Sequence, residues 1–188
     1  MRYMHNILSA SRILATPACA ILAVFEETRF IALVIAILVP LTDLVDGPLA
    51  RRVGGVSAFG ALLDMTSDKV FLCTMAIVLS AIGLAPAWAA AIITARELIV
   101  LSLRCFAAGH NRPLPIATFG KLKSFLLYLL VPLALVPEWC GFAEGFANAV
   151  WFLALAASVS AGASLAEYLV KMWGDLAADF VGRSSAPK

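Results

Sequence analysis

Apolar residues run along most of this chain in six stretches, and polar residues gather in the short connections between them. A helix that crosses a bilayer needs about 20 mostly apolar residues. The six stretches that satisfy this length lie approximately at residues 8–25, 30–50, 57–81, 86–105, 118–136 and 145–168. The pattern predicts an all-α, polytopic membrane protein of six transmembrane helices.

One uncharged stretch, residues 70–95, is long enough to be a single helix. Its centre reads Gly83-Leu84-Ala85-Pro86, and glycine commonly ends a helix whereas proline commonly begins one. We therefore predict a turn here, between the third and fourth helices.

The positions of lysine and arginine support this choice, because cytoplasmic loops of membrane proteins are enriched in both residues. With six helices, one side of the membrane carries only Arg29. The other side carries Arg2, Arg51, Arg52, Arg104, Arg112, Lys121, Lys123, Lys171, Arg183 and Lys188. This asymmetry predicts that both termini are cytoplasmic.

Composition agrees with a membrane location. Of the 188 residues, 62% are hydrophobic and 14% charged, and the mean hydropathy is +0.95, whereas soluble domains are about 25% charged. A net charge of +2 gives no support for nucleic-acid binding. We expect a membrane domain at residues 1–172 and a short cytoplasmic tail at 173–188. We interpret the N-terminal stretch as the first helix rather than a signal peptide, because Arg12 interrupts its apolar run.

The cysteines fall one to a segment, at Cys19, Cys73, Cys105 and Cys140, with no CxxC spacing. Neither a disulfide framework nor a zinc site is indicated, so we interpret them as small apolar residues.

Four aspartates, Asp43, Asp46, Asp64 and Asp68, stand toward the expected cytoplasmic ends of the second and third helices. An aspartate near the middle of a bilayer costs at least ~2.5 kcal/mol, so each needs a partner or a wet cavity. Spacings of three and four residues place each pair on one face of its helix. A short loop makes the two helices neighbours, and hard divalent ions such as Mg²⁺ or Mn²⁺ would offset the repulsion between the carboxylates.

Residues beside the aspartates suit a phosphate ligand. Gly47, Ala50 and Gly60 leave the helix surface bare, and Arg51 can bind phosphate oxygens in a bidentate manner. The alternative for the small residues is close packing between membrane helices. We interpret Arg52 and Lys69 as interfacial charges whose head groups reach toward water.

The arrangement Asp43-x2-Asp46-Gly47-x2-Ala50-Arg51-x8-Gly60-x3-Asp64-x3-Asp68 resembles the signature of the CDP-alcohol phosphotransferases, membrane enzymes that build phospholipid head groups. The resemblance implies a six-helix fold, a homodimer, and a divalent metal site formed by the four aspartates, with Asp68 also the general base. It implies that Gly47, Ala50 and Gly60 line the cytidine pocket and that Arg51 holds the diphosphate.

Three further segments are similar to the phosphatidylglycerophosphate synthase subgroup: Asn6-x2-Ser9-x2-Arg12-x4-Pro17, Ala95-Arg96-Glu97 and Gly120-Lys121-Leu122-Lys123. This similarity implies transfer of a phosphatidyl group from CDP-diacylglycerol to glycerol 3-phosphate, with release of CMP at the cytoplasmic face of the inner membrane. Arg96, Arg104, Lys121 and Lys123 add positive charge on that side, which would attract the acceptor phosphate.

Other interpretations stay open. Lys121 and Lys123 also fit ordinary cytoplasmic loop charges, and Arg96 could form a structural ion pair with Glu97. The subgroup has a glutamine where this chain has Leu127, and Asp-Pro-x-Ala-Asp-Lys where it reads Asp-Met-Thr-Ser-Asp-Lys. A sister enzyme that uses phosphatidylglycerol or inositol phosphate, a cation transporter and an inactive scaffold are the alternatives.

Overall fold

The computed structural model describes residues 2–52, 58–109, 118–136 and 143–180, and side chains at 11–41, 66–107, 119–136 and 145–173. Within these ranges the secondary structure is all helical. It consists of α1 (Arg2–Val24), the short 3-10 helix η1 (Glu26–Thr28), α2 (Arg29–Arg52), α3 (Ala58–Ala81), α4 (Ala87–Gly109), α5 (Thr118–Ala134) and α6 (Ala143–Phe180). The expected all-α class is confirmed.

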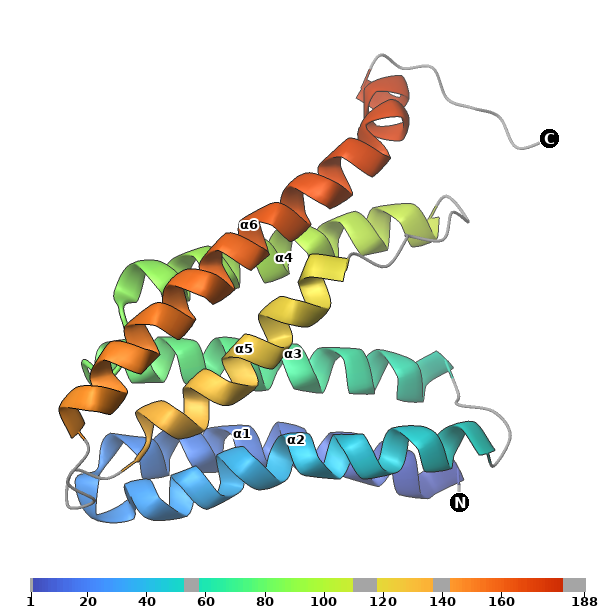
Figure 1. Cartoon of the computed structure of the whole chain (residues 1–188). Helices are drawn as coiled ribbons and strands as arrows, with labels where there is room; N and C mark the ends of the chain where they lie inside the picture. The colour runs from blue at the N-terminus through green and yellow to red at the C-terminus, as the bar shows by residue number, and fades with distance from the viewer. Residues whose placement is uncertain (1, 53–57, 110–117, 137–142, 181–188) are drawn as a thin grey trace.

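The helices run back and forth, so that α1 begins and α6 ends at the same end of the molecule (Figure 1). Helix α2 ends and α3 begins at this end as well. Helix α1 packs against α2 and α3, α5 packs against α2, α3 and α6, and α4 packs against α3 and α6. Helices α3 to α6 therefore form a connected group, which bears the polar residues described below.

The turn between α3 and α4 has the predicted position and chemistry. Gly83 has a φ angle of +78°, a conformation that a residue with a Cβ rarely adopts. The amide of Gly83 donates to the carbonyl of Ser80 at 3.1 Å, and the amide of Leu84 donates to the carbonyl of Leu79 at 2.8 Å. These bonds form a Schellman motif, which ends α3 and satisfies its last carbonyls.

Arg29, the lone cation expected on the non-cytoplasmic side, stabilises the corner between α1 and α2. Its Nε donates to the carbonyl of Ala23 at 3.3 Å, and the Thr28 hydroxyl donates to the carbonyl of Leu22 at 2.7 Å. The last carbonyls of a helix lack partners within the helix, so both contacts cap the end of α1.

Small residues form much of the helix packing surface. Among the described side chains of α1 and α2, those with at most 1% exposure are Cys19, Ala23, Ala32 and Ala36. The Cys19 thiol lies 3.5 Å from the carbonyl oxygen of Ala32. In α6 they are Ala154, Ala157, Ala161 and Ser164, spaced three or four residues apart. Small residues let helices approach closely, as is typical of membrane helices.

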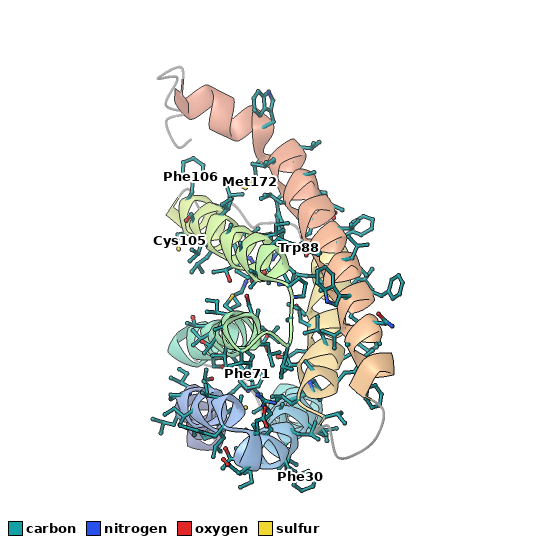
Figure 2. The ribbon with its side chains drawn as sticks, turned by 90° about the vertical axis from the view of Figure 1, so that its left-hand side faces the viewer. Phe30, Phe71, Trp88, Cys105, Phe106 and Met172 are labelled. Carbon is teal, nitrogen blue, oxygen red and sulfur yellow. The ribbon has the colours of Figure 1, made fainter. Side chains whose placement is uncertain are left out.

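Many large apolar side chains lie on the outside. Leu14, Phe30, Phe125, Phe152 and Val170 are each at least half exposed, and many side chains of this kind project from the ribbon in Figure 2. Large apolar residues also fill the core, where Phe71 and Met75 are fully buried, but so many on the outside are unusual for a water-soluble helix bundle. This arrangement suits contact with lipid.

By length and apolar composition, one helical segment in the described part of the chain qualifies as a membrane span, Gly145–Trp173, and 39% of its apolar 18-residue window is buried within the molecule. The six-span topology therefore stays a prediction. Helix α6 continues to Phe180, beyond the expected end near residue 168. Its 38 residues correspond to roughly 57 Å, so it is longer than a bilayer core of about 30 Å. The expected domain boundary at residue 172 falls inside this helix and stays a prediction.

The buried position of Ala157 in α6 allows the helix packing to be tested. Ala157 is fully buried in the main core, so Ala157→Leu must displace neighbouring side chains, at a cost of about 1–3 kcal/mol. We expect a lower unfolding temperature in detergent.

Gly162 provides the matched control on the same helix, because a Cβ placed there meets nothing within 4 Å. Gly162→Ala should leave the unfolding temperature unchanged or raise it. Equal unfolding temperatures for Ala157→Leu and the unmodified protein would contradict the packing described.

Candidate functional site

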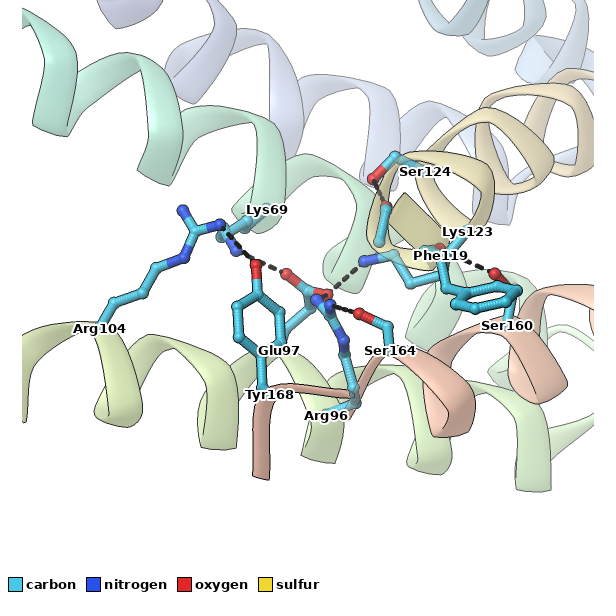
Figure 3. A network of polar contacts seen from close by, with 11 residues as sticks. Lys69, Arg96, Glu97, Arg104, Phe119, Lys123, Ser124, Ser160, Ser164 and Tyr168 are labelled. Carbon is cyan, nitrogen blue, oxygen red and sulfur yellow. Dashed lines mark hydrogen bonds and ion pairs between the residues drawn. The ribbon is translucent and has the colours of Figure 1, made fainter. Parts of the chain in front are cut away.

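A buried network of charged and hydroxyl side chains joins α3, α4, α5 and α6 (Figure 3). At its centre is Glu97 of α4, which is 5% exposed. Cations from three helices surround its carboxylate: Lys69 of α3, Arg96 of α4 and Lys123 of α5. This cluster, which we call the Glu97 cluster, comprises these four residues.

The two carboxylate oxygens of Glu97 bind different cations. Oε2 accepts a hydrogen bond from Nζ of Lys69 at 2.8 Å. Oε1 accepts one from Nη1 of Arg96 at 2.6 Å and another from Nζ of Lys123. The side chains of Arg96 and Lys123 are 6% and 3% exposed, so these ion pairs lie inside the helix bundle.

Helix α6 holds the arginines from the other side. Nη2 of Arg96 donates to the hydroxyl of Ser164, and the Arg96 guanidinium lies 5.8 Å from the centre of the Tyr168 ring. Nη2 of Arg104 donates to the hydroxyl of Tyr168 at 3.2 Å. Because Ser164 and Tyr168 are four residues apart, they share one face of α6. Arg96 and Arg104 meet this face at two successive levels.

The Glu97 cluster has an excess of positive charge. Three cations and one carboxylate give the four residues a net charge of +2. Removing ions from water costs several kcal/mol per ion, and only good pairing compensates for it. One carboxylate cannot pair fully with three cations, so an anionic ligand would be stabilised here.

One donor in the network is also unused. Nε of Arg96 is buried and has no hydrogen-bond partner among the described residues. A buried N–H without an acceptor costs about 1–3 kcal/mol. Together with the net charge, this donor makes the cluster a candidate binding site for an oxyanion.

The expected metal ligands lie on the expected helices. Asp43 and Asp46 are in α2, and Asp64 and Asp68 are in α3, so the helical spacing that places each pair on one face is present. Asp68 is half-buried, whereas the side chains of the other three aspartates lie outside the described residues. Among the described side chains, no group of three or more potential ligands could hold a metal ion. A contact between the two aspartate pairs stays a prediction.

The expected nucleotide-binding residues are in the same helices. Gly47, Ala50 and Arg51 belong to α2, and Gly60 belongs to α3. The side chains of Ala50 and Arg51 and the surroundings of Gly47 and Gly60 lie outside the described residues. Where the structure does describe contacts, the main neighbours of α2 are α1 and α5.

The four expected acceptor residues do not form one group. Arg96 and Lys123 both bind Glu97, and Arg104 joins them through Tyr168. Lys121 is exposed. It lies two positions before Lys123 in α5, so the two side chains are about 200° apart around the helix and cannot share a face. The ion pair between Arg96 and Glu97, which the alternative interpretation expected, is present.

The interpretation of Lys69 as an interfacial charge was wrong. Its side chain is only 19% exposed and binds Glu97, because the buried carboxylate offers a better partner than a distant membrane surface. The sequence interpretation also missed the roles of Ser164 and Tyr168 and the central position of Glu97. One signal was present, since an acidic residue within an apolar helix requires partners.

The lysines of α5 provide a matched test of the cluster. Lys123→Met leaves Glu97 paired with Lys69 and Arg96 but removes a buried hydrogen bond between charged groups, which contributes about 1.5–3 kcal/mol in typical cases. We expect a clearly lower unfolding temperature in detergent. Lys121→Met changes an exposed side chain and should have almost no effect. Similar shifts for both variants would show that Lys123 is not paired as described.

The sequence of this chain is similar to that of known proteins of one family. The family model described as "CDP-alcohol phosphatidyltransferase" matches residues 2–183. A protein of Mycobacterium tuberculosis (strain H37Rv), named "Probable phosphatidylglycerophosphate synthase", is 34% identical over 71% of this chain and 66% of its own length. A Bacillus subtilis protein, named "CDP-diacylglycerol--glycerol-3-phosphate 3-phosphatidyltransferase", is 35% identical over 52% of this chain and 51% of its own.

A third relative, from Streptomyces coelicolor, has a different name, "Cardiolipin synthase (CMP-forming)". It is 30% identical over 76% of this chain and 69% of its own length. The chain thus spans about half to two thirds of the relatives it matches. Because the family model covers nearly every residue, the chain belongs to the CDP-alcohol phosphatidyltransferase family.

Proposed function

We propose that this protein transfers the phosphatidyl group of CDP-diacylglycerol to glycerol 3-phosphate, which gives phosphatidylglycerophosphate and CMP. Family membership and the relatives named for this reaction support the proposal. The observation that carries the choice of acceptor is the buried Glu97 cluster, with its net charge of +2 and its unused donor on Arg96.

The charge of the cluster favours a phosphomonoester. A phosphomonoester carries a charge of about −1.5 to −2 at pH 7, close in magnitude to the cluster's excess. Phosphatidylglycerol, the acceptor in a CMP-forming cardiolipin synthase, carries a phosphodiester with one negative charge. Glycerol 3-phosphate therefore matches the cluster better than phosphatidylglycerol does.

The position of the cluster fits the reaction. Lys69 directly follows Asp68 in α3, so the cluster begins one residue from the proposed general base. The attacking hydroxyl and the phosphate of glycerol 3-phosphate are at opposite ends of a three-carbon chain. With its phosphate at Lys123 and Arg96, the acceptor can extend toward Asp68.

In the proposed reaction, the acceptor hydroxyl oxygen attacks the phosphorus that bears the diacylglycerol group. A new P–O bond forms as the P–O bond to the CMP phosphate breaks. Asp68 accepts the proton of the hydroxyl, and CMP leaves with the electron pair of the broken bond. Arg51 binds the diphosphate, while Gly47, Ala50 and Gly60 leave room for the cytidine.

The family is in general dependent on divalent metal ions. Four carboxylates on two helices are an all-oxygen donor set, which suits Mg²⁺ or Mn²⁺. We propose that Asp43, Asp46, Asp64 and Asp68 hold one or two such ions. A bound ion would neutralise charge on the diphosphate and make its phosphorus a better electrophile.

We further propose six membrane-spanning helices with both termini and the active site at the cytoplasmic face of the inner membrane. The common end at which α1 begins and α6 ends supports this topology, as does the outward position of the large apolar side chains. A homodimer is proposed on the family resemblance alone.

An acceptor comparison tests the proposed reaction. Purified protein in detergent with Mg²⁺ and CDP-diacylglycerol should release CMP and form phosphatidylglycerophosphate when glycerol 3-phosphate is added. Phosphatidylglycerol, which carries a single negative charge, should give at least about tenfold lower kcat/KM, and inositol phosphate, which is also a phosphomonoester, tests the acceptor beyond its charge. Preference for either of these acceptors would refute the proposed acceptor while it leaves the transferase chemistry intact.

Removal of the proposed metal ligands tests the other half of the site. Asp43→Ala and Asp64→Ala should each lower CMP release to background, because the donor set loses a carboxylate, and EDTA should do the same to the unmodified protein. Asp68→Asn should also abolish turnover through loss of the base. Full activity in the alanine variants would rule out the metal assignment, and full activity in Asp68→Asn would rule out the base.

A further inference from the structure

Glu97 is the carboxylate that Lys69, Arg96 and Lys123 share. We propose that Glu97 is a positioning residue, which holds the ammonium of Lys123 and the guanidinium of Arg96 where they receive the acceptor phosphate. This inference rests on the proposed function, because it assigns the acceptor phosphate to these two cations.

The geometry leaves donors available after Glu97 is satisfied. A lysine ammonium has three donors and an arginine guanidinium has five. Lys123 uses one of its donors on Glu97. Arg96 uses Nη1 on Glu97 and Nη2 on Ser164, and its Nε is buried without a partner among the described residues. The pair can therefore hold Glu97 and bind phosphate oxygens at the same time.

Lys123 depends more strongly on Glu97 than Arg96 does. Arg96 also contacts Ser164 and the ring of Tyr168, so its position is fixed from two sides. For Lys123, Glu97 is the hydrogen-bond partner that the structure records. A lysine side chain is long and flexible, so without this contact its ammonium would no longer be held in one place.

Glu97 also keeps the three cations together. Like charges in a medium of low dielectric constant repel strongly, and the carboxylate lies between them. The contact of Lys69 with Oε2 pulls α3 toward α4 at the residue after Asp68. Loss of Glu97 would therefore alter the spacing between the phosphate-binding cations and the proposed base.

The test is steady-state kinetics of the full chain in detergent, with each substrate varied in turn. Glu97→Gln keeps the size of the side chain but removes its charge. We expect the KM for glycerol 3-phosphate to rise at least about tenfold, while the KM for CDP-diacylglycerol changes by less than about twofold. Calorimetric titration with glycerol 3-phosphate alone should show the same loss of affinity.

Two further variants separate positioning from general stability. Glu97→Asp retains the charge on a shorter side chain and should recover part of the acceptor affinity. Glu26→Gln is the matched control, because Glu26 is 77% exposed and pairs only with nearby Arg29 among the described residues, at 3.4 Å. It should leave both KM values unchanged. If Glu97→Gln does not fold, the comparison of Glu97→Asp with the unmodified protein decides, with a selective rise in the acceptor KM expected.

Unchanged acceptor KM in Glu97→Gln, or a fall in kcat with both KM values unchanged, would overturn the positioning role. So would equal acceptor affinity in the aspartate and glutamine variants. Failure of the proposed function would look different, because the unmodified protein itself would then fail to use glycerol 3-phosphate. In that case the role assigned to Glu97 falls with the function.

Discussion

The shared carboxylate of Glu97 binds cations from α3, α4 and α5, and Arg96 extends these contacts to α6. Four of the helices in the described structure therefore meet through one buried polar group. Buried ion pairs are poor sources of stability when compared with well-packed apolar residues. Their presence in a mainly apolar core is better explained by a ligand that needs charge at this place.

The remaining packing is compatible with such a site. Where charged side chains do not separate the helices, small residues such as Ala32, Ala157 and Ala161 allow close contact. Many large apolar side chains are turned outward, while others, such as Phe71 and Met75, fill the core. Close packing of small residues and a core of larger apolar side chains thus hold the bundle around the Glu97 cluster.

Much of the fold follows from apolar patterning. All six expected stretches are helices, and the turn at Gly83 follows from a glycine that can adopt a positive φ angle. What patterning does not give is the rotation of one helix against another. The pattern therefore did not predict the ion pair between Lys69 and Glu97. Helical spacing alone, in contrast, is enough to place Lys121 and Lys123 on different faces of α5. The aspartates could be placed on their helices but not brought into contact, because that requires side chains outside the described residues.

The central claim is that the Glu97 cluster binds the acceptor phosphate. An experimental structure in lipid nanodiscs with glycerol 3-phosphate and Mg²⁺ tests it most directly. The account predicts phosphate density within hydrogen-bond distance of Nζ of Lys123 and Nε of Arg96, with Glu97 still bound to both residues. A fully occupied glycerol 3-phosphate molecule bound elsewhere, with Nε of Arg96 still lacking an acceptor, would contradict it.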